Sequence, residues 1–269
     1  MKILFIADIV GRPGREAVAA FLPELRKTYQ LDLVIANAEN ASHGRGLTRD
    51  TATELYDYGV NFLTMGNHVW DQKDIVKFID NENKLIRPAN YPRGVPGKGY
   101  GFVSLNGIKT GIINLSGRIF LQPLDNPFTM IIPLINAMAQ ETPIIIVDFH
   151  AEATSEKVAL GWFLNGKVSA VIGTHTHIQT ADARVLNQGT AYITDAGMTG
   201  PRDSVLGVKK EIIINNFLTQ MPARFEVADG VHQLNGVVLD IDEKTGKARS
   251  IQPIQRDNGE TEGRRPLSP

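Results

Sequence analysis

The sequence predicts a mixed α/β fold with two β-sheets in one domain. In the first half, short β-branched runs alternate with helical patterns, an order typical of parallel strands covered by helices. In the second half, consecutive strands and a hairpin favour a second, mixed sheet. The 269 residues are near the upper size of a single hydrophobic core. Residues 1–255 are therefore expected to form one domain.

The expected strands are short runs rich in Val, Ile, Leu and Phe, bounded by turn residues. They are Lys2–Asp8, Asp32–Ala38, Asn61–Met65, Lys84–Pro88, Phe102–Leu105, Gly111–Leu115, Ile144–Phe149, Val168–Gly173 and Ala191–Thr194. A hairpin is expected from Asn235–Asp242 and Lys247–Ile254, because the residues DEKTG between them have the composition of a turn.

The helical patterns lie between these strands. They are Pro13–Tyr29, Thr51–Tyr58, Lys73–Asp80, Met130–Gln140 and Ser155–Leu164. Pro13 suits a first helical turn, whereas Pro23 is expected to bend or end the helix. Thr51 and Glu54 have the spacing of a capping box.

Three polar or glycine-rich segments are expected to lack regular structure. Pro88–Gly101 and Gly197–Gly207 are predicted to be long loops, which in compact domains are often functional. Arg256–Pro269 is polar without periodicity and is predicted to be a flexible C-terminal tail.

Composition excludes several kinds of site. The chain has no cysteine, which rules out disulfides, iron–sulfur clusters and thiolate zinc sites. The net charge of −1 gives no strong nucleic-acid or anionic-membrane signature. Neither a signal peptide nor a membrane-spanning stretch is recognisable, so a cytoplasmic location is expected.

Five apolar runs each end in residue types that bind metal ions. In open α/β sheets, ligands bind outside the carboxyl ends of the strands, so these side chains are expected to meet. His175 and His177 are two residues apart and point to the same side of an extended segment. The candidates are Asp8, Glu39, Asn40, Asn67, His68, His150, His175 and His177. The pattern predicts a metal site.

Single members of this set have simpler readings. Asp8 suits a helix N-cap, Asn67 suits a turn, and His150 suits a hydrogen-bonded core histidine. The five strand ends taken together favour the metal site.

The motifs Gly66-Asn67-His68, the lone His150 and Gly173-Thr-His175-Thr-His177 resemble the last three signature blocks of calcineurin-like metallophosphoesterases. Two blocks differ from that superfamily. The usual Asp-x-His is Asp8-Ile9-Val10, and the usual Gly-Asp block is NAEN at 37–40. With HAEATSEK at 150–157 and DAGMTGPRDS at 195–204, the chain resembles the YmdB-type bacterial cyclic-nucleotide phosphodiesterases.

This resemblance implies a four-layer αββα sandwich of two mixed β-sheets and two metal ions per chain, both bound by Glu39. Asp8, Asn40 and His177 would complete the first site, and Asn67, His150 and His175 the second. Because the oxygen of Asn40 takes the place of an imidazole, iron is expected first, then manganese, and zinc less.

The implied activity is hydrolysis of cyclic nucleotides, 2′,3′-cyclic before 3′,5′-cyclic, by hydroxide held between the ions. His68 is expected to protonate the leaving oxygen, or else to orient phosphate or water. Asp71 and Asp148 are candidate acceptors from imidazole N–H groups. The substrate partner is a small phosphodiester. A nucleotidase or phosphomonoesterase, a nuclease and a nucleotide-sensing regulatory protein stay open as alternatives, and so does homo-oligomer formation.

Overall fold

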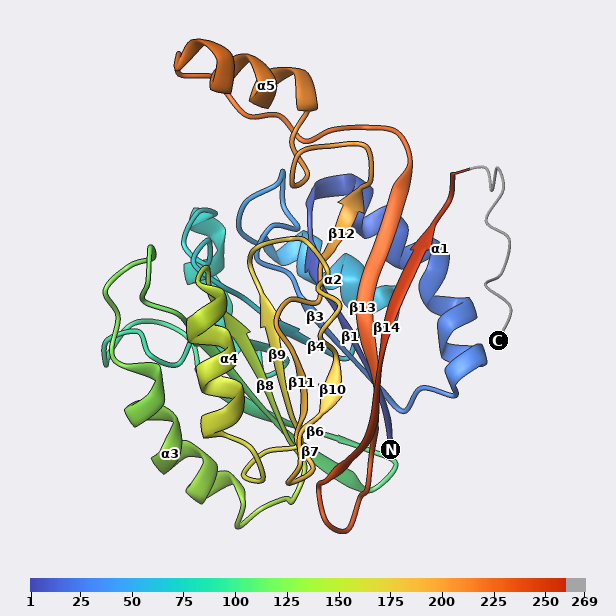
Figure 1. Cartoon of the computed structure of the whole chain (residues 1–269), viewed down its shortest axis with the longest axis vertical. Coiled ribbons are helices and arrows are strands. Elements are labelled where there is room, and N and C mark those ends of the chain that lie inside the picture. The colour runs from blue at the N-terminus through green and yellow to red at the C-terminus, as the bar shows by residue number, and fades with distance from the viewer. Residues whose placement is uncertain (260–269) are drawn as a thin grey trace.

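Two mixed β-sheets form the centre of the computed structural model, which describes residues 1–259 (Figure 1). The first sheet has the strand order β2 (Asp8–Ile9), β12 (Met198–Pro201), β13 (His232–Ile241), β1 (Lys2–Ile6), β3 (Leu33–Asn37), β4 (Phe62–Thr64) and β5 (Leu85–Ile86), and β14 (Ala248–Asp257) also pairs with β13. Strands β1, β3, β4 and β5 are parallel, whereas β13 is antiparallel to β1, β12 and β14.

The second sheet has the order β10 (Arg184–Val185), β11 (Ala191–Ile193), β9 (Ala170–Thr174), β8 (Ile145–His150), β7 (Ile108–Ser116) and β6 (Tyr100–Leu105). Strands β7, β8, β9 and β11 are parallel, and β6 and β10 are antiparallel to their neighbours. Because β8 and β9 run the same way, their ends deliver histidines to one edge of this sheet.

Four helices cover the outer faces of the sheets. Helices α1 (Gly11–Tyr29) and α2 (Arg49–Asp57) lie on the first sheet, and α3 (Pro127–Met138) and α4 (Thr154–Phe163) lie on the second (Figure 1).

Three separate apolar cores join these four layers. Along β1, Leu4 and Ile6 face the α1 side, while Ile3 and Phe5 face the second sheet. This alternation is the two-residue period of a strand buried on both faces. Phe149 of β8 faces α4 in the third core. The predicted four-layer αββα sandwich is confirmed.

The helix boundaries depart from the predicted ones in α1 and α2. Helix α1 begins at Gly11 and continues past Pro23 to Tyr29, so the proline does not end it. The N-cap of α2 is Thr48, whose side chain accepts a hydrogen bond from the Thr51 amide. The predicted capping box was therefore wrong, and Glu54 instead pairs with Arg15 on α1.

The segment predicted as a helix over Lys73–Asp80 forms two 3₁₀ turns, η1 (Lys73–Lys77) and η2 (Ile79–Asn81). Ile75 and Phe78 both enter the first core. Their three-residue separation suits the turn of a 3₁₀ helix, which explains the departure from α geometry.

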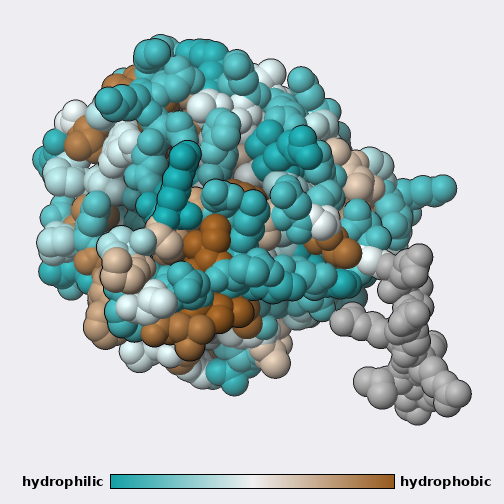
Figure 2. All heavy atoms as spheres, turned by 90° about the horizontal axis from the view of Figure 1, so that it is seen from above, coloured by the Kyte–Doolittle hydropathy of each residue, from teal (hydrophilic) through white to brown (hydrophobic). Residues whose placement is uncertain are grey.

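Three elements were not predicted: β10, β12 and α5 (Lys210–Thr219). Strand β12 lies in the predicted loop Gly197–Gly207, where Met198 and Thr199 pair with β2. Helix α5 projects from the body of the molecule, and none of its residues is buried (Figure 1). Figure 2 looks onto this side and shows apolar atoms gathered within a mostly hydrophilic face.

The C-terminal strand is longer than predicted. Arg256 and Asp257, which belong to the predicted tail, lie in β14 and pair with Leu234 and Gln233 of β13. Residues 260–269 of that tail lie outside the described residues. Among the helices of residues 1–259, none has the length and apolar character needed to cross a membrane.

Candidate metal centre

The carboxyl ends of strands from both sheets meet where the candidate ligands lie. Glu39 and Asn40 follow β3, Asn67 follows β4, His150 ends β8, and His175 and His177 follow β9. Asp8 lies in β2 and is not the N-cap of α1, which is Val10. The Asp8 carboxylate accepts a hydrogen bond of 2.8 Å from the His175 amide, so the two sheets are linked at the site.

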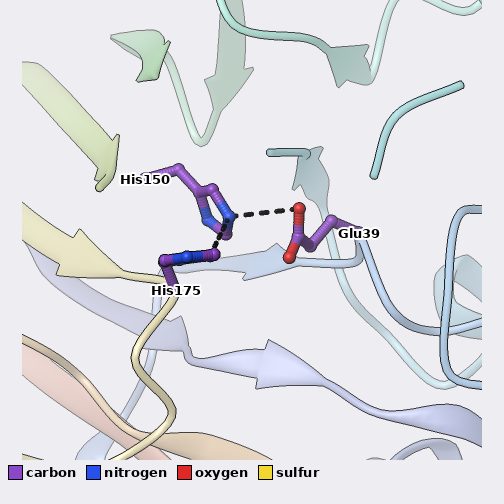
Figure 3. A group of neighbouring side chains, drawn as sticks. All are labelled: Glu39, His150 and His175. Carbon is purple, nitrogen blue, oxygen red and sulfur yellow. Dashed lines mark hydrogen bonds and ion pairs between the residues drawn. The ribbon is translucent and has the colours of Figure 1, made fainter. Parts of the chain in front are cut away.

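One group of donor atoms surrounds the His150 imidazole. Its Nε2 atom lies 2.9 Å from Asn67 Oδ1, 3.0 Å from His175 Nδ1 and 3.2 Å from Glu39 Oε2. Figure 3 shows Glu39, His150 and His175 pointing toward one another, and their donor atoms lie within 4.8 Å of each other. Gly66 is required here, because a Cβ at this position would collide with Glu39 and His150.

A second group surrounds His177. Its Nε2 atom lies 3.3 Å from Asn40 Nδ2 and 3.5 Å from Asp8 Oδ2. Asn40 Nδ2 also donates to Glu39 Oε1 at 3.0 Å. Glu39 therefore directs Oε1 toward this group and Oε2 toward the His150 group, as a carboxylate shared by two cations requires.

A buried hydrogen-bond chain fixes the orientation of His150. Its Nδ1 atom lies 3.0 Å from Thr174 Oγ1, which donates to Asp148 Oδ1 at 2.8 Å. Asn37 and Thr64 also donate to Asp148. Since the Thr174 proton is used on Asp148, Thr174 accepts from Nδ1–H, and Nε2 is the His150 nitrogen that faces the site. Asp148 thus reaches the imidazole through Thr174 and not directly.

His175 and His177 are oriented in the same way. His175 Nε2 lies 3.0 Å from the Glu152 carboxylate, and His177 Nδ1 lies 3.1 Å from the Leu206 carbonyl oxygen. Each acceptor takes the N–H of one ring nitrogen and leaves the lone pair of the other nitrogen facing the site. Each of the three histidines thus presents one ring nitrogen to the site.

The electrostatics of the protein alone are unfavourable at this site. Asp8 Oδ1 is buried and has no hydrogen-bond partner among residues 1–259. Burial, and next the nearby Glu39 carboxylate, raise the pKa of Asp8 well above its usual value even though His150 opposes the shift. Two buried carboxylates beside three imidazoles are the donor set that a pair of cations would satisfy.

The histidines respond to the same charges in opposite directions. Burial disfavours a charged His150, but Glu39 outweighs this effect and raises the pKa of His150 to about 9. Burial and then repulsion from His150 lower the pKa of His175 to about 3. His175 is therefore a neutral, metal-competent imidazole across the physiological range.

A cavity of about 330 Å³ opens onto both donor groups. His68 lines it, and its Nδ1 lies 2.8 Å from Asp71 Oδ2, so Asp71 is the acceptor that was predicted. This contact leaves Nε2 of His68 unused. The His68 amide donates to Glu39 Oε2 at 3.2 Å, which holds the residue beside the His150 group.

Several residues of this cavity were not predicted. Arg45 is the one arginine or lysine among the described residues that line it. Of the two long loops predicted from the sequence, Gly197–Gly207 contributes Leu206 and Gly207, whereas Pro88–Gly101 contributes no lining residue to this part of the described structure. Glu152 was also missed, although it lies within the HAEATSEK segment.

Comparisons with known proteins show the family of the chain. Residues 4–254 match the family described as YmdB-like protein. A Bacillus subtilis (strain 168) protein named 2′,3′-cyclic-nucleotide 2′-phosphodiesterase is 54% identical over 254 residues, covering 94% of this chain and 96% of the relative.

Two solved structures are similar in fold. A Mycoplasma pneumoniae protein described as a novel phosphatase is 39% identical with a TM-score of 0.90, over 96% of this chain and 93% of that one. The Bacillus subtilis calcineurin-like phosphoesterase YfkN is 13% identical with a TM-score of 0.58, over 95% and 90% of the two chains. The second likeness supports the fold alone.

Proposed function

The chain belongs to the YmdB-like family, and we propose that it is a metal-dependent phosphodiesterase that hydrolyses the 2′ ester of 2′,3′-cyclic nucleotides. The observation that carries this proposal is that the two carboxylate oxygens of Glu39 face different donor groups. A site for two metal ions built in this way suits the hydrolysis of phosphate esters. The name of the 54% identical relative supports the substrate class. The 3′,5′-cyclic nucleotides are the slower substrates, since a six-membered ring releases less strain on opening.

The two donor groups would each hold one cation. Asp8, Asn40 and His177 would bind the first, Asn67, His150 and His175 the second, and Glu39 both. When bound, the ions neutralise phosphate charge and supply a water of lowered pKa as the nucleophile. Asn40 directs Nδ2 toward His177 and Glu39, so its amide would turn over to present Oδ1 to the cation. This oxygen would harden the first site relative to an imidazole, which favours iron, then manganese, over zinc.

His68 supplies the proton for the leaving group. Hydrolysis forms a bond from a water oxygen to phosphorus and breaks the bond from phosphorus to the 2′ oxygen, which takes a proton; the product is a nucleoside 3′-phosphate. Asp71 holds Nδ1 of His68, so Nε2 is the atom that faces the cavity and delivers the proton. The proton also prevents the tethered 2′ oxygen from closing the ring again.

A substrate panel tests this function. We expect metal-replete protein to give the highest kcat/KM with 2′,3′-cyclic AMP, a lower value with 3′,5′-cyclic AMP, and little turnover of AMP or short linear RNA. A preference for RNA would make the protein a nuclease. If the protein binds two ions but turns over none of these substrates, it would instead be a regulatory protein that senses nucleotides.

A phosphomonoesterase is the second candidate function. The observation that favours it is the Mycoplasma pneumoniae relative, which is described as a phosphatase. A preference for AMP over both cyclic nucleotides in the same panel would select this function.

A further inference from the structure

A fully buried ion pair lies directly behind the His175-Thr176-His177 segment. Lys157 of α4 donates from Nζ to Asp195 Oδ2 at 2.8 Å, and their side chains are 1% and 0% exposed. Burying two charges is costly unless their remaining hydrogen-bonding capacity is also used. Lys157 comes from the HAEATSEK segment and Asp195 from the DAGMTGPRDS segment, and the proposed chemistry gives neither of these two residues a role.

Asp195 holds Thr176 by two further hydrogen bonds. Its Oδ2 atom accepts from the Thr176 amide at 3.0 Å and from Thr176 Oγ1 at 2.7 Å, while Oδ1 accepts from the Gly197 amide at 2.8 Å. Lys157 Nζ also lies 3.4 Å from Thr176 Oγ1. Both oxygens of Asp195 are thus used within the protein, so this carboxylate is not offered to a cation.

The backbone on each side of Thr176 needs such support. His175 has a φ of 97° and His177 a φ of 65°, both in the left-handed region that non-glycine residues rarely adopt. The segment is therefore not extended, as the sequence suggested, and in this conformation His175 points to one donor group and His177 to the other. Gly173 allows the close approach, because a Cβ there would overlap the Thr194 carbonyl and contact the Lys157 side chain.

We propose that Lys157 and Asp195 are positioning residues that lock Thr176, and thereby direct His175 to one donor group and His177 to the other. This inference rests on the proposed dinuclear site. It does not depend on which phosphate ester is the substrate.

The test measures metal affinity and the geometry of the metal pair in Lys157→Met, with Leu160→Ala as the matched control. Leu160 lies one turn further along α4 and is buried in the third core, so its truncation destabilises the helix without touching Thr176. We expect Lys157→Met to weaken binding of manganese about 10- to 100-fold, the usual cost of losing a group that orients ligands. The electron paramagnetic resonance signature of the coupled manganese pair should change as well.

Leu160→Ala should lower the melting temperature but keep wild-type manganese affinity and spectrum. If manganese affinity falls in both Lys157→Met and Leu160→Ala in proportion to the fall in their melting temperatures, the effect is one of stability alone and the proposal is overturned. If Lys157→Met does not fold, Thr176→Val decides, because it keeps the ion pair and removes only the hydroxyl. Wild-type affinity and spectrum in Thr176→Val would then overturn the proposal, and weakened affinity would support it. Wild-type protein that binds two ions but cleaves no cyclic nucleotide would refute the proposed function alone.

Discussion

Replacing His68 by alanine separates proton delivery from metal binding. The imidazole contacts Asp71 at 2.8 Å, and its side chain is about a quarter exposed, so its removal leaves neither a core cavity nor an unpaired buried charge. The donor atoms of both metal groups belong to other side chains. We therefore expect the His68→Ala variant to keep its fold and both ions.

The size of the effect follows from the role of a positioned acid. Such groups contribute about 10²- to 10⁴-fold, which corresponds to about 3–5 kcal/mol of transition-state stabilisation. The kcat for 2′,3′-cyclic AMP should fall by this amount. Asp71→Asn should cause a smaller loss, because the imidazole remains and only its orientation is weakened.

Leaving-group dependence provides the decisive assay. A nitrophenyl phosphodiester releases a stable phenolate that needs little protonation, so His68→Ala should lose much less activity with it than with 2′,3′-cyclic AMP. Metal content and melting temperature, measured on the same preparations, serve as controls. Equal losses for the two substrates would refute the assignment and indicate that His68 orients phosphate or water.

Three further variants test other parts of the site. Glu39→Gln should weaken binding of both ions together. If elemental analysis shows the loss of one ion alone, the carboxylate is not shared by the two ions. Asp8→Asn should weaken binding of the first ion. The metal-free variant should melt at the same temperature as the wild-type protein or higher, because the raised pKa of Asp8 means that its charged form is disfavoured in the fold. A clearly lower melting temperature of the metal-free variant would contradict this expectation. Arg45→Ala should raise KM about fivefold with little change in kcat, as for an exposed ion pair worth about 1 kcal/mol. An unchanged KM would mean that Arg45 does not contact substrate.

The two sheets, their covering helices and the ligand-bearing edge were predicted because they follow from local patterns, whereas the four-layer arrangement was implied by the family resemblance. Near-continuous apolar runs indicate strands buried on both faces, as in β1 and β8. Residues of metal-binding types at the ends of such runs are expected to lie close together, because parallel strands present their carboxyl ends to one edge of the sheet. The structure brings these residues together.

The elements that escaped prediction depend on distant partners. Strand β12 has the sequence Met-Thr-Gly-Pro, which has little intrinsic strand preference, and it is a strand because β2 and β13 pair with it. Helix α5 lacks the amphipathic pattern by which buried helices are recognised, in keeping with its having no buried residue. No short-range signal indicates either element.

The supporting residues of the site were hidden for the same reason. Lys157 of α4 and Asp195, which follows β11, are 38 residues apart, and only tertiary packing makes them an ion pair. Asp148 was recognised as a candidate acceptor, but its contact with His150 through Thr174 depends on the register of β8 and β9. Such contacts are set by tertiary structure, which spacing along the chain does not reveal.

Metal stoichiometry tests the central claim most directly. Seven candidate ligands in two donor groups that share Glu39 predict close to two transition-metal ions per chain in purified or iron-reconstituted protein, by elemental analysis against protein concentration. The same preparation should lose hydrolysis of 2′,3′-cyclic AMP on chelation and regain it when iron or manganese is added back. Protein that holds no metal, and takes up neither iron, manganese nor zinc, would contradict the dinuclear site and the function proposed from it.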